Sequence, residues 1–509
     1  MFHATFARFQ ALLVDPDPRR QRWVILALLL ASGLFIGLLV GVAGPLVALA
    51  LALVLIAGAL VLRDVMWGLV GVIAISALLP FATLPFKIGF TPSFLDLAIF
   101  ATFGVWALQY ALGQRTRLET SSIGGAVALF LIMAAFTFAM GLQHARPTSN
   151  NLRQFMEMVL SISLFFVTIN VVQTRRQLTF LAKALMLGGA GAAALGILFY
   201  VMPQDATVWV LDRLARFGYP GGFGALRFIN DDPNGVMRAI GTSIDPNVFG
   251  GLLIMLGVFT APQLFVKKPI FSRHWIILFL AMEVLALYLT MSRGSMFGFG
   301  LGLVAIGALR YRKLLVLGLI AAAVFFFLPF TQDYIQYALT GLAGQDRSTQ
   351  MRIGEYRDAL RLISAYPIFG VGFTGTPQID LYIGVSSLYL LMAEEMGLVG
   401  LAVFLITIIL FLNALIQGLR RSRKDPKLDA LLLGVLGATV GLLAGGLLDH
   451  YLFNLTYPHM TSLLWIFVGL GMVAVQFALA ETLETAPAQL VHNQRSKIND
   501  QKRSYEAFL

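Results

Sequence analysis

The fold class is decided by the run LYLLMAEEMGLVGLAVFLITIILFLNALIQ, residues 388–417. After Glu395 it carries no charge, and its apolar residues follow one another without alternation. About 20 such residues cross a hydrocarbon core about 30 Å thick. Only helices and closed barrels satisfy the backbone there, and barrel strands alternate polar with apolar residues. The run is therefore expected to be a membrane helix, longer than one crossing requires.

Similar runs recur along the chain. Of its 509 residues, 58% are hydrophobic and only 12% are charged, and the mean hydropathy is +0.81. Soluble domains carry about 25% charged residues. The sequence predicts an all-α, polytopic membrane protein with about 14 (12–14) transmembrane helices. The expected spans are 23–41, 45–62, 65–82, 94–112, 123–142, 154–173, 178–201, 247–266, 275–291, 295–310, 314–331, 388–417, 429–448 and 460–480.

Basic loops give the topology. With the N-terminus inside, every second loop is basic, as the positive-inside rule expects. The net charge of +11 thus reflects topology, and nucleic acid is not an expected partner. The chain divides into a cytoplasmic segment 1–22, a transmembrane domain 23–481 and a cytoplasmic tail 482–509. The inner clusters are Arg19 to Arg22, Arg115 with Arg117, Arg175 with Arg176, Lys267 to Arg273, Arg310 to Lys313 and Arg420 to Lys427.

Two long outer loops, 202–246 and 332–387, are expected to carry function. The outer face holds eleven arginines but a single lysine, Lys87. Topology does not explain this bias, because arginine and lysine satisfy the positive-inside rule equally well. The planar guanidinium of arginine binds phosphate better, through two N–H groups at once. The alternative is that these arginines pair with outer carboxylates. The outer arginines are Arg146, Arg153, Arg213, Arg216, Arg227, Arg238, Arg293, Arg347, Arg352, Arg357 and Arg361, and the carboxylates include Asp212, Asp231, Asp232, Glu355 and Asp358.

Within the second loop, residues 348–365 have the pattern of an amphipathic helix that stops before Pro367. Arg357 and Arg361 lie one turn apart beside its apolar stripe, with Arg352 at the other edge. Such a helix is expected in the membrane interface, at the depth of a lipid-linked diphosphate. It could also be a surface helix with solvated charges. The following Gly370 and Gly372 would let backbone approach a ligand.

Further candidates lie at the ends of spans. Arg293 sits at a membrane edge, either to bind substrate or to reach the interface. Asp245 is expected to cap the helix that starts at Pro246, whose free N–H groups could also bind an anion. Glu394 and Glu395 lie in a membrane span, as a general base or as partners of an arginine.

Metal and thiol chemistry have little support. The chain has no cysteine, so a thiolate nucleophile and a cysteine metal site are excluded. His450 and His459 flank a short outer loop, but two histidines at this spacing are a weak metal signal. Asn230, Asp231, Asp232 and Asn234 are read more simply as a turn around Pro233. No metal and no cofactor are expected.

Taken in order, the outer-face segments resemble the O-antigen ligase and polymerase family of bacterial envelope proteins. Their placement on one side makes the match more specific than any segment alone. The segments are Gly241-Thr-Ser-Ile-Asp-Pro-Asn247 with Gly250 and Gly251, Met291-Ser-Arg-Gly294, the stretch Arg352 to Gly372, Tyr389 to Gly400, and Asp449-His-Tyr-Leu-Phe-Asn454 followed by Pro458-His459.

The resemblance implies a GT-C-like, metal-independent membrane glycosyltransferase in the bacterial cytoplasmic (inner) membrane. Its partners would be undecaprenyl-diphosphate-linked glycan donor and acceptor, membrane lipid, and a possible chain-length regulating co-polymerase. The family's polymerases carry an Arg, ten residues and a Gly in outer loops; Arg361 and Gly372 fit, whereas Gly250 follows Arg238 one residue too late. Glu395, or otherwise Glu394, would accept the acceptor's proton. The diphosphate would be held by Arg293, Arg352, Arg357 and Arg361, with Arg216, Arg227 or Arg238, while Asp245, Gly372, Tyr389 and His450 complete the expected site.

One departure separates the two activities. Ligases of the family have a His-Asn or similar pair where this chain has Ser386 and Ser387. This favours a polymerase of lipid-linked repeats over a ligase, although His450 could take the histidine's place. A transporter is the rival from another class, and it predicts helices broken near the midplane. The expected spans are mostly uninterrupted, with charges gathered at one face.

Overall fold

The computed structural model describes residues 44–87, 89–328, 331–374 and 385–484, together with isolated residues between 26 and 41. The chain divides into an N-terminal part, up to Trp67, and a larger part that follows. In the first part, helix α3 (Pro45–Arg63) starts with a proline at its first turn and exposes apolar side chains such as Leu55 and Leu62. The expected span 23–41 lies almost wholly outside the described residues.

Helices follow at every expected span from 45–62 onward. Among the described residues, eight helices are long and apolar enough to cross a membrane, so the protein is a polytopic membrane protein. The expectation of about 14 crossings is not reached by this measure, because several of the apolar helices are shorter than one crossing. The remaining long helices are α4 (Met66–Leu78), α5 (Phe94–Ala111), α6 (Gly124–Gly141), α7 (Ser149–Val171), α8 (Arg175–Val201), α10 (Pro246–Thr260), α11 (Arg273–Leu289), α12 (Arg293–Leu309), α13 (Arg312–Phe327), α16 (Leu388–Arg421), α17 (Pro426–Gly445) and α18 (Pro458–Glu484).

The two long loops are folded. The first contains α9 (Gln204–Leu214) and a hairpin of β1 (Arg227–Phe228) and β2 (Met237–Arg238), and the second contains α14 (Gln332–Leu342) and α15 (Arg347–Ala365). The predicted helix 348–365 is therefore confirmed. Single-turn 3₁₀ helices complete the chain: η1 (Ala215–Phe217), η2 (Phe223–Ala225), η3 (Ile229–Asp231), η4 (Gly241–Ser243), η5 (Ala261–Phe265), η7 (Ser422–Lys424) and η8 (Tyr451–Phe453).

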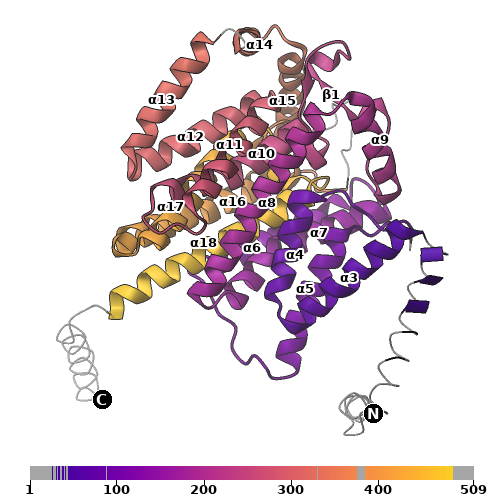
Figure 1. Ribbon diagram of the computed structural model, residues 1–509, viewed down its shortest axis with the longest axis vertical. Helices are drawn as coiled ribbons and strands as arrows, with labels where there is room; N and C mark the ends of the chain where they lie inside the picture. Colours follow the sequence, from indigo (N-terminus) through magenta and orange to yellow (C-terminus); the bar gives the residue numbers. More distant parts are fainter. Residues whose placement is uncertain are drawn as a thin grey trace. The chain divides into compact units, whose positions relative to one another are not determined.

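Helices α10, α17 and α18 pack side by side and are mostly buried (Figure 1). Glycines bring α12 against α17: a Cβ atom on Gly298 would lie 2.5 Å from the carbonyl oxygen of Gly441, and one on Gly302 would lie 2.8 Å from that of Gly437. Small residues four apart on both helices are typical of close packing in membranes. This contact fixes the N-terminal end of α12 beside the C-terminal end of α17.

The long run 388–417 is one helix with a break. Gly397 has φ 70°, a left-handed conformation that only glycine adopts readily. The segment after α15 fills the break: Val371 donates to the carbonyl oxygen of Glu394 at 2.8 Å, and Gly372 donates to that of Glu395 at 2.9 Å. These bonds satisfy carbonyl groups that a broken membrane helix would leave unpaired. The expectation of mostly uninterrupted spans therefore fails for this helix.

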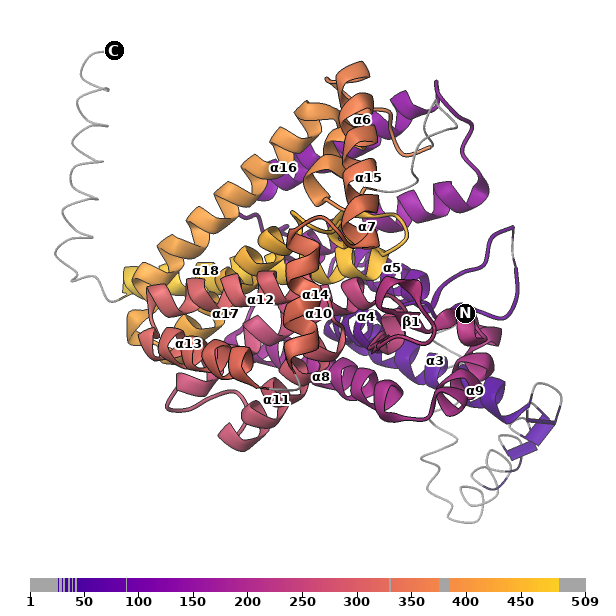
Figure 2. The ribbon, with the colours of Figure 1, turned by 90° about the horizontal axis from the view of Figure 1, so that it is seen from above.

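Figure 2 shows α15 and α6 beside the broken part of α16. Gly372 has φ 79°, and a Cβ atom there would lie 2.5 Å from the Cα atom of Gly141 in α6. Gly370 likewise lies directly against the backbone of α16. The backbone approach expected from these glycines is thus made to two helices of the same chain.

Candidate functional site

We call the end of the helix bundle that carries both long loops the site end. The hairpin there pairs Arg227 directly with Arg238 across its two strands. Like charges directly opposite one another destabilise a hairpin. Arg238 is half-buried; its Nε donates to the carbonyl oxygen of Thr290 and its Nη2 to Oδ1 of Asn247, both at 2.8 Å. These bonds fix the guanidinium at the start of α10.

The charges around Arg238 come from four separate elements. Burial lowers the pKa of Arg238, and Arg352 of α15 lowers it further, whereas Tyr337, Asp245 and Asp449 raise it. Asp245 caps α10 as expected, since its Oδ1 accepts from the N–H groups of Asn247 at 2.8 Å and Val248 at 3.0 Å. Segments far apart in sequence thus bring arginines and carboxylates together at one place.

Of these cations, Arg352 has the fewest bonded partners among the described residues. It is half-buried on α15, and among the described residues no hydrogen bond or ion pair engages its guanidinium. Its charge nevertheless acts on Arg238, on Tyr356 and on Asp449. A half-buried guanidinium with free N–H groups is suited to a bidentate anion.

Asp449 lies in the loop between α17 and η8 and was absent from the expected site. Burial raises its pKa, as does Asp245, whereas His450 and Arg352 lower it. Its backbone oxygen accepts from Leu388 at 2.9 Å, which ties the loop to the start of α16. The only signal for it in the sequence is that Asp449 and His450 are two adjacent polar residues between membrane spans.

Arg293 anchors the corner between α14 and α15. Its Nη2 donates to Oδ2 of Asp346 at 2.7 Å, its Nη1 donates to the carbonyl oxygen of Tyr337 at 3.2 Å, and its guanidinium lies over the Tyr337 ring at 4.5 Å. Gly341 leaves room for it, because a Cβ atom there would clash with Nη1. Arg293 therefore contacts α14 through Tyr337 and the start of α15 through Asp346. Asp346 lies six residues before Arg352.

Other expected arginines are exposed. Arg361 is 68% exposed and lies 3.4 Å from Asp358, so the alternative of carboxylate pairing is confirmed for it. Arg357 and Arg216 are exposed, and Arg227 donates to the carbonyl oxygen of Gly224 at 3.0 Å. The charge of Arg227 still acts on the partly buried Tyr457, on which Asp245 and Asp449 also act. Arg227 therefore lies at the edge of the group formed by Arg238, Arg352, Asp245 and Asp449.

The two membrane glutamates lie at the break in α16. Each has one buried carboxylate oxygen without a hydrogen-bond partner among the described residues. Glu394 is close enough to Asp358 of α15 for their charges to interact. Tyr389, also expected at the site, donates its hydroxyl to the carbonyl oxygen of Leu443 at 2.8 Å. Neither glutamate is among the groups that act on Arg238 or Asp449.

The two histidines of the last outer loop lie on either side of Tyr457. His450 and His459 both contact Tyr457, with ring centroids 6.3 Å and 6.0 Å from its ring. Within the described residues there is no group of three His, Cys, Asp or Glu side chains placed to hold a metal ion. The Asn230 to Asn234 segment forms a turn, in which Asp232 Oδ1 accepts from the Asn234 N–H at 3.0 Å.

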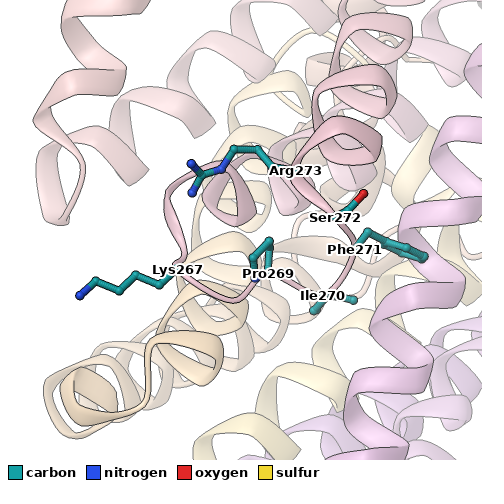
Figure 3. Close-up of a pocket in the computed structure, with 6 residues that line it drawn as sticks. All are labelled: Lys267, Pro269, Ile270, Phe271, Ser272 and Arg273. Atoms are coloured by element: carbon teal, nitrogen blue, oxygen red, sulfur yellow. The ribbon is translucent and has the colours of Figure 1, made fainter.

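A separate cavity of about 400 Å³ lies beside the residues that lead into α11 (Figure 3). Its lining is a single loop between η5 and α11, and Lys267 points away from the other labelled residues. Nearby basic side chains are already engaged: Lys183 lies over the Phe271 ring at 5.5 Å, and Arg273 donates to the Val266 carbonyl oxygen at 3.2 Å. The cavity contains none of the expected site residues.

Two comparisons with known proteins bear on this arrangement. Residues 276–405 match the family model described as O-Antigen ligase, so the resemblance read from the sequence is confirmed over α11 to the middle of α16. The match covers Arg293, Arg352 and the α16 break. The search of curated proteins finds no match.

Proposed function

We propose that this protein polymerises undecaprenyl-diphosphate-linked saccharide repeats. It is a polytopic membrane protein whose residues 276–405 match the family model described as O-Antigen ligase. The product would be a surface polysaccharide, which is an O-antigen, a capsule or an exopolysaccharide. The reaction takes place at the outer side of the bacterial cytoplasmic membrane. A hydroxyl group of the acceptor glycan attacks the anomeric carbon of the donor, and the lipid diphosphate departs.

The observation that carries this proposal is the convergence of Arg238 and Arg352 from different loops. The diphosphate gains negative charge as the glycosidic bond breaks, and pre-positioned cations stabilise that charge. Three carboxylates lie near Arg227, Arg238 and Arg352, namely Asp245, Asp449 and Glu355. Among these arginines, Arg352 has no bonded partner in the described part of the chain and can bind an anionic ligand.

The other expected residues have supporting roles in this proposal. Arg293 holds the start of α15 through Asp346, which keeps Arg352 in place. The exposed Arg357 and Arg361 attract the donor's headgroup along α15, and Arg216 does so beside α9. The reaction needs no cofactor, because guanidinium groups provide the countercharge.

The second candidate is a ligase that transfers the finished glycan from its lipid carrier to lipid or protein. The matched family's own description favours it. Ser386 and Ser387 argue against it, because they stand where the family's ligases have a His-Asn or similar pair. Ser386 donates its backbone N–H to Glu355 at 2.9 Å, and Ser387 is the residue directly before α16. A transporter has weaker support: α16 is broken at Gly397, but its broken backbone is satisfied by residues 371 and 372.

Deletion of the gene followed by analysis of surface glycans tests the proposal. A polymerase deletion removes long chains and leaves single repeats attached, whereas a ligase deletion leaves polymer on the lipid carrier. Complementation with Arg352→Lys is compared with complementation by Arg423→Lys, an exposed arginine at the opposite end. Restoration of long chains by both variants alike would contradict the assigned site.

A further inference from the structure

The cavity between η5 and α11 combines positive charge with an apolar wall (Figure 3). Lys267 and Arg273 line it together with Ile270 and Phe271. Lys268 adds a further exposed cation beside Lys267. Residues 261–275 contain no aspartate and no glutamate, so the loop carries no acidic residue that could neutralise these charges.

The basic side chains around this cavity contact neutral groups. Arg273 donates from Nη2 to the carbonyl oxygen of Val266 at 3.2 Å, which leaves its other N–H groups unbonded. Nζ of Lys183 in α8 lies 5.5 Å from the centroid of the Phe271 ring. Among the described residues no ion pair engages these two cations or Lys267. Their positive charge is therefore open to an anion from outside the chain.

Other basic clusters expected on the inner side differ in this respect. Arg310 pairs with Asp429 at 3.3 Å, and Arg175 pairs with Asp425. In both cases a carboxylate of the chain itself neutralises the arginine. The loop before α11 has the same expected topology but lacks such a partner, so an ion pair between helix ends does not explain its charge.

Hydrogen-bond donors adjoin the same cavity. Gln263 of η5 is buried, and its Oε1 accepts the backbone N–H of Ile270, a residue of the cavity wall, at 3.2 Å. Nε2 of the same amide has no hydrogen-bond partner among the described residues. Ser272 precedes α11 without making a capping bond, so the first N–H groups of that helix lack their usual side-chain acceptor. Cations beside such donors suit the oxygen atoms of a phosphate group.

The side of α11 next to the cavity is suited to lipid. Trp275, Leu278 and Leu285 are all exposed, and their spacing puts them on one face of the helix. Tryptophan is typical of the membrane–water interface, and exposed leucines of a membrane helix contact acyl chains. A phosphate bound in the cavity would thus have an apolar strip beside it for the chains of its own lipid.

We propose that this cavity binds the phosphate of an anionic phospholipid of the inner leaflet. Basic pockets at the cytoplasmic ends of membrane helices bind such headgroups. Lys267, Lys268 and Arg273 neutralise the phosphate, and the amide of Gln263 donates to it from the buried side. The site shares no residue with the arginine cluster around Arg352, so it does not depend on the proposed polymerisation.

The test is native mass spectrometry of the full-length protein, titrated with dioleoyl phosphatidylglycerol in detergent. We expect Lys267→Gln combined with Arg273→Gln to weaken the apparent Kd of the first bound lipid about thirtyfold, since each basic side chain near an anionic headgroup contributes about fivefold. Arg312→Gln combined with Lys313→Gln is the matched control. It removes the same two charges from exposed positions of the next inner loop, and it should leave that Kd unchanged.

An equal loss of affinity in both double variants, or no loss in either, would overturn the proposal. If the first variant has a lowered melting temperature, Lys267→Gln combined with Lys268→Gln decides, because it keeps the bond from Arg273 to Val266. That variant must also weaken the lipid's Kd while the control does not. Excess inorganic phosphate separates the two sources of a phosphate group. It should fail to displace the lipid, and displacement would overturn the lipid assignment in favour of a free anion.

Discussion

At the end of the bundle opposite the site, Arg310 donates to Asp429 at 3.3 Å and to the carbonyl oxygen of Leu419 at 2.7 Å, and Arg175 is paired with Asp425. At the site end, Arg352 is half-buried beside Arg238 and Asp449 without a direct bond to either. Each arginine at the opposite end thus joins two helix ends through its own partner. At the site end, charged residues from four elements lie near one another, and the guanidinium of Arg352 has no bonded partner among the described residues.

The difference indicates two uses of the same residue type. A half-buried charge without a bonded partner is costly to the fold, so its retention calls for another benefit. Paired arginines at the opposite end need no such explanation, because topology and helix contacts account for them. We propose that anion binding supplies the benefit at the site end.

The two ends should lie on opposite sides of the membrane, which is an all-or-none effect. Reporter fusions near Arg117, Arg176, Lys268, Arg312 and Arg423 should report the cytoplasm. Fusions near Gly224 and Gly344 should report the outside, because only the loops of the opposite end are consistently basic. Alkaline phosphatase and fluorescent protein fusions give opposite signals for the two sides. A cytoplasmic signal at Gly224 or Gly344 would contradict both the topology and the site.

Arg352→Lys and Arg238→Lys should cause the largest loss of activity. Lysine keeps the charge but loses the planar fork that binds an anion through two N–H groups. The loss of one such contact is expected to cost about 2.7–4 kcal/mol in transition-state stabilisation, or about a hundredfold or more in rate. The measurement is polymer made in vitro from lipid-linked repeats at matched protein levels. Arg423→Lys is the control, and an equal rate for all three variants would remove the functional distinction between the ends.

The sequence predicted the local features well. Apolar runs located the helices, and the pattern at 348–365 located α15 to within one residue of Arg347. It could not predict the break at Gly397, because that break depends on a segment more than twenty residues earlier that fills it. The pairing of Arg293 with Asp346 and the approach of Asp449 to Arg352 are likewise tertiary. The residue types indicated which side chains could bind diphosphate. The difference between Arg352, which is half-buried, and Arg361, which is exposed, depends on the tertiary structure.

Arg357→Lys and Arg361→Lys sharpen the comparison within α15. From the sequence alone, both should lose activity as strongly as a transition-state contact. Their exposure favours a smaller loss, because exposed charge pairs contribute about 0.2–1 kcal/mol, equivalent to about fivefold or less. The same polymerisation assay at low and high salt decides, since screening should remove the effect of exposed arginines but not that of Arg352. A hundredfold loss in Arg361→Lys would move the diphosphate site onto the exposed face of α15.

We expect that removal of divalent cations leaves the rate of polymerisation unchanged, which is the smallest effect among these predictions. Beside the arginines, Asp245 Oδ1 accepts two backbone N–H groups and Asp449 Oδ1 accepts one. In the acidic turn of the first long loop, the exposed Asp231 lies 4.0 Å from the exposed Arg347. A divalent cation such as Mg²⁺ needs several oxygen ligands, and Arg238 and Arg352 would repel it from this place. The assay is polymerisation by purified protein in EDTA. Activity that disappears in EDTA and returns with Mg²⁺ or Mn²⁺ would show that a metal ion, rather than arginine, neutralises the departing diphosphate.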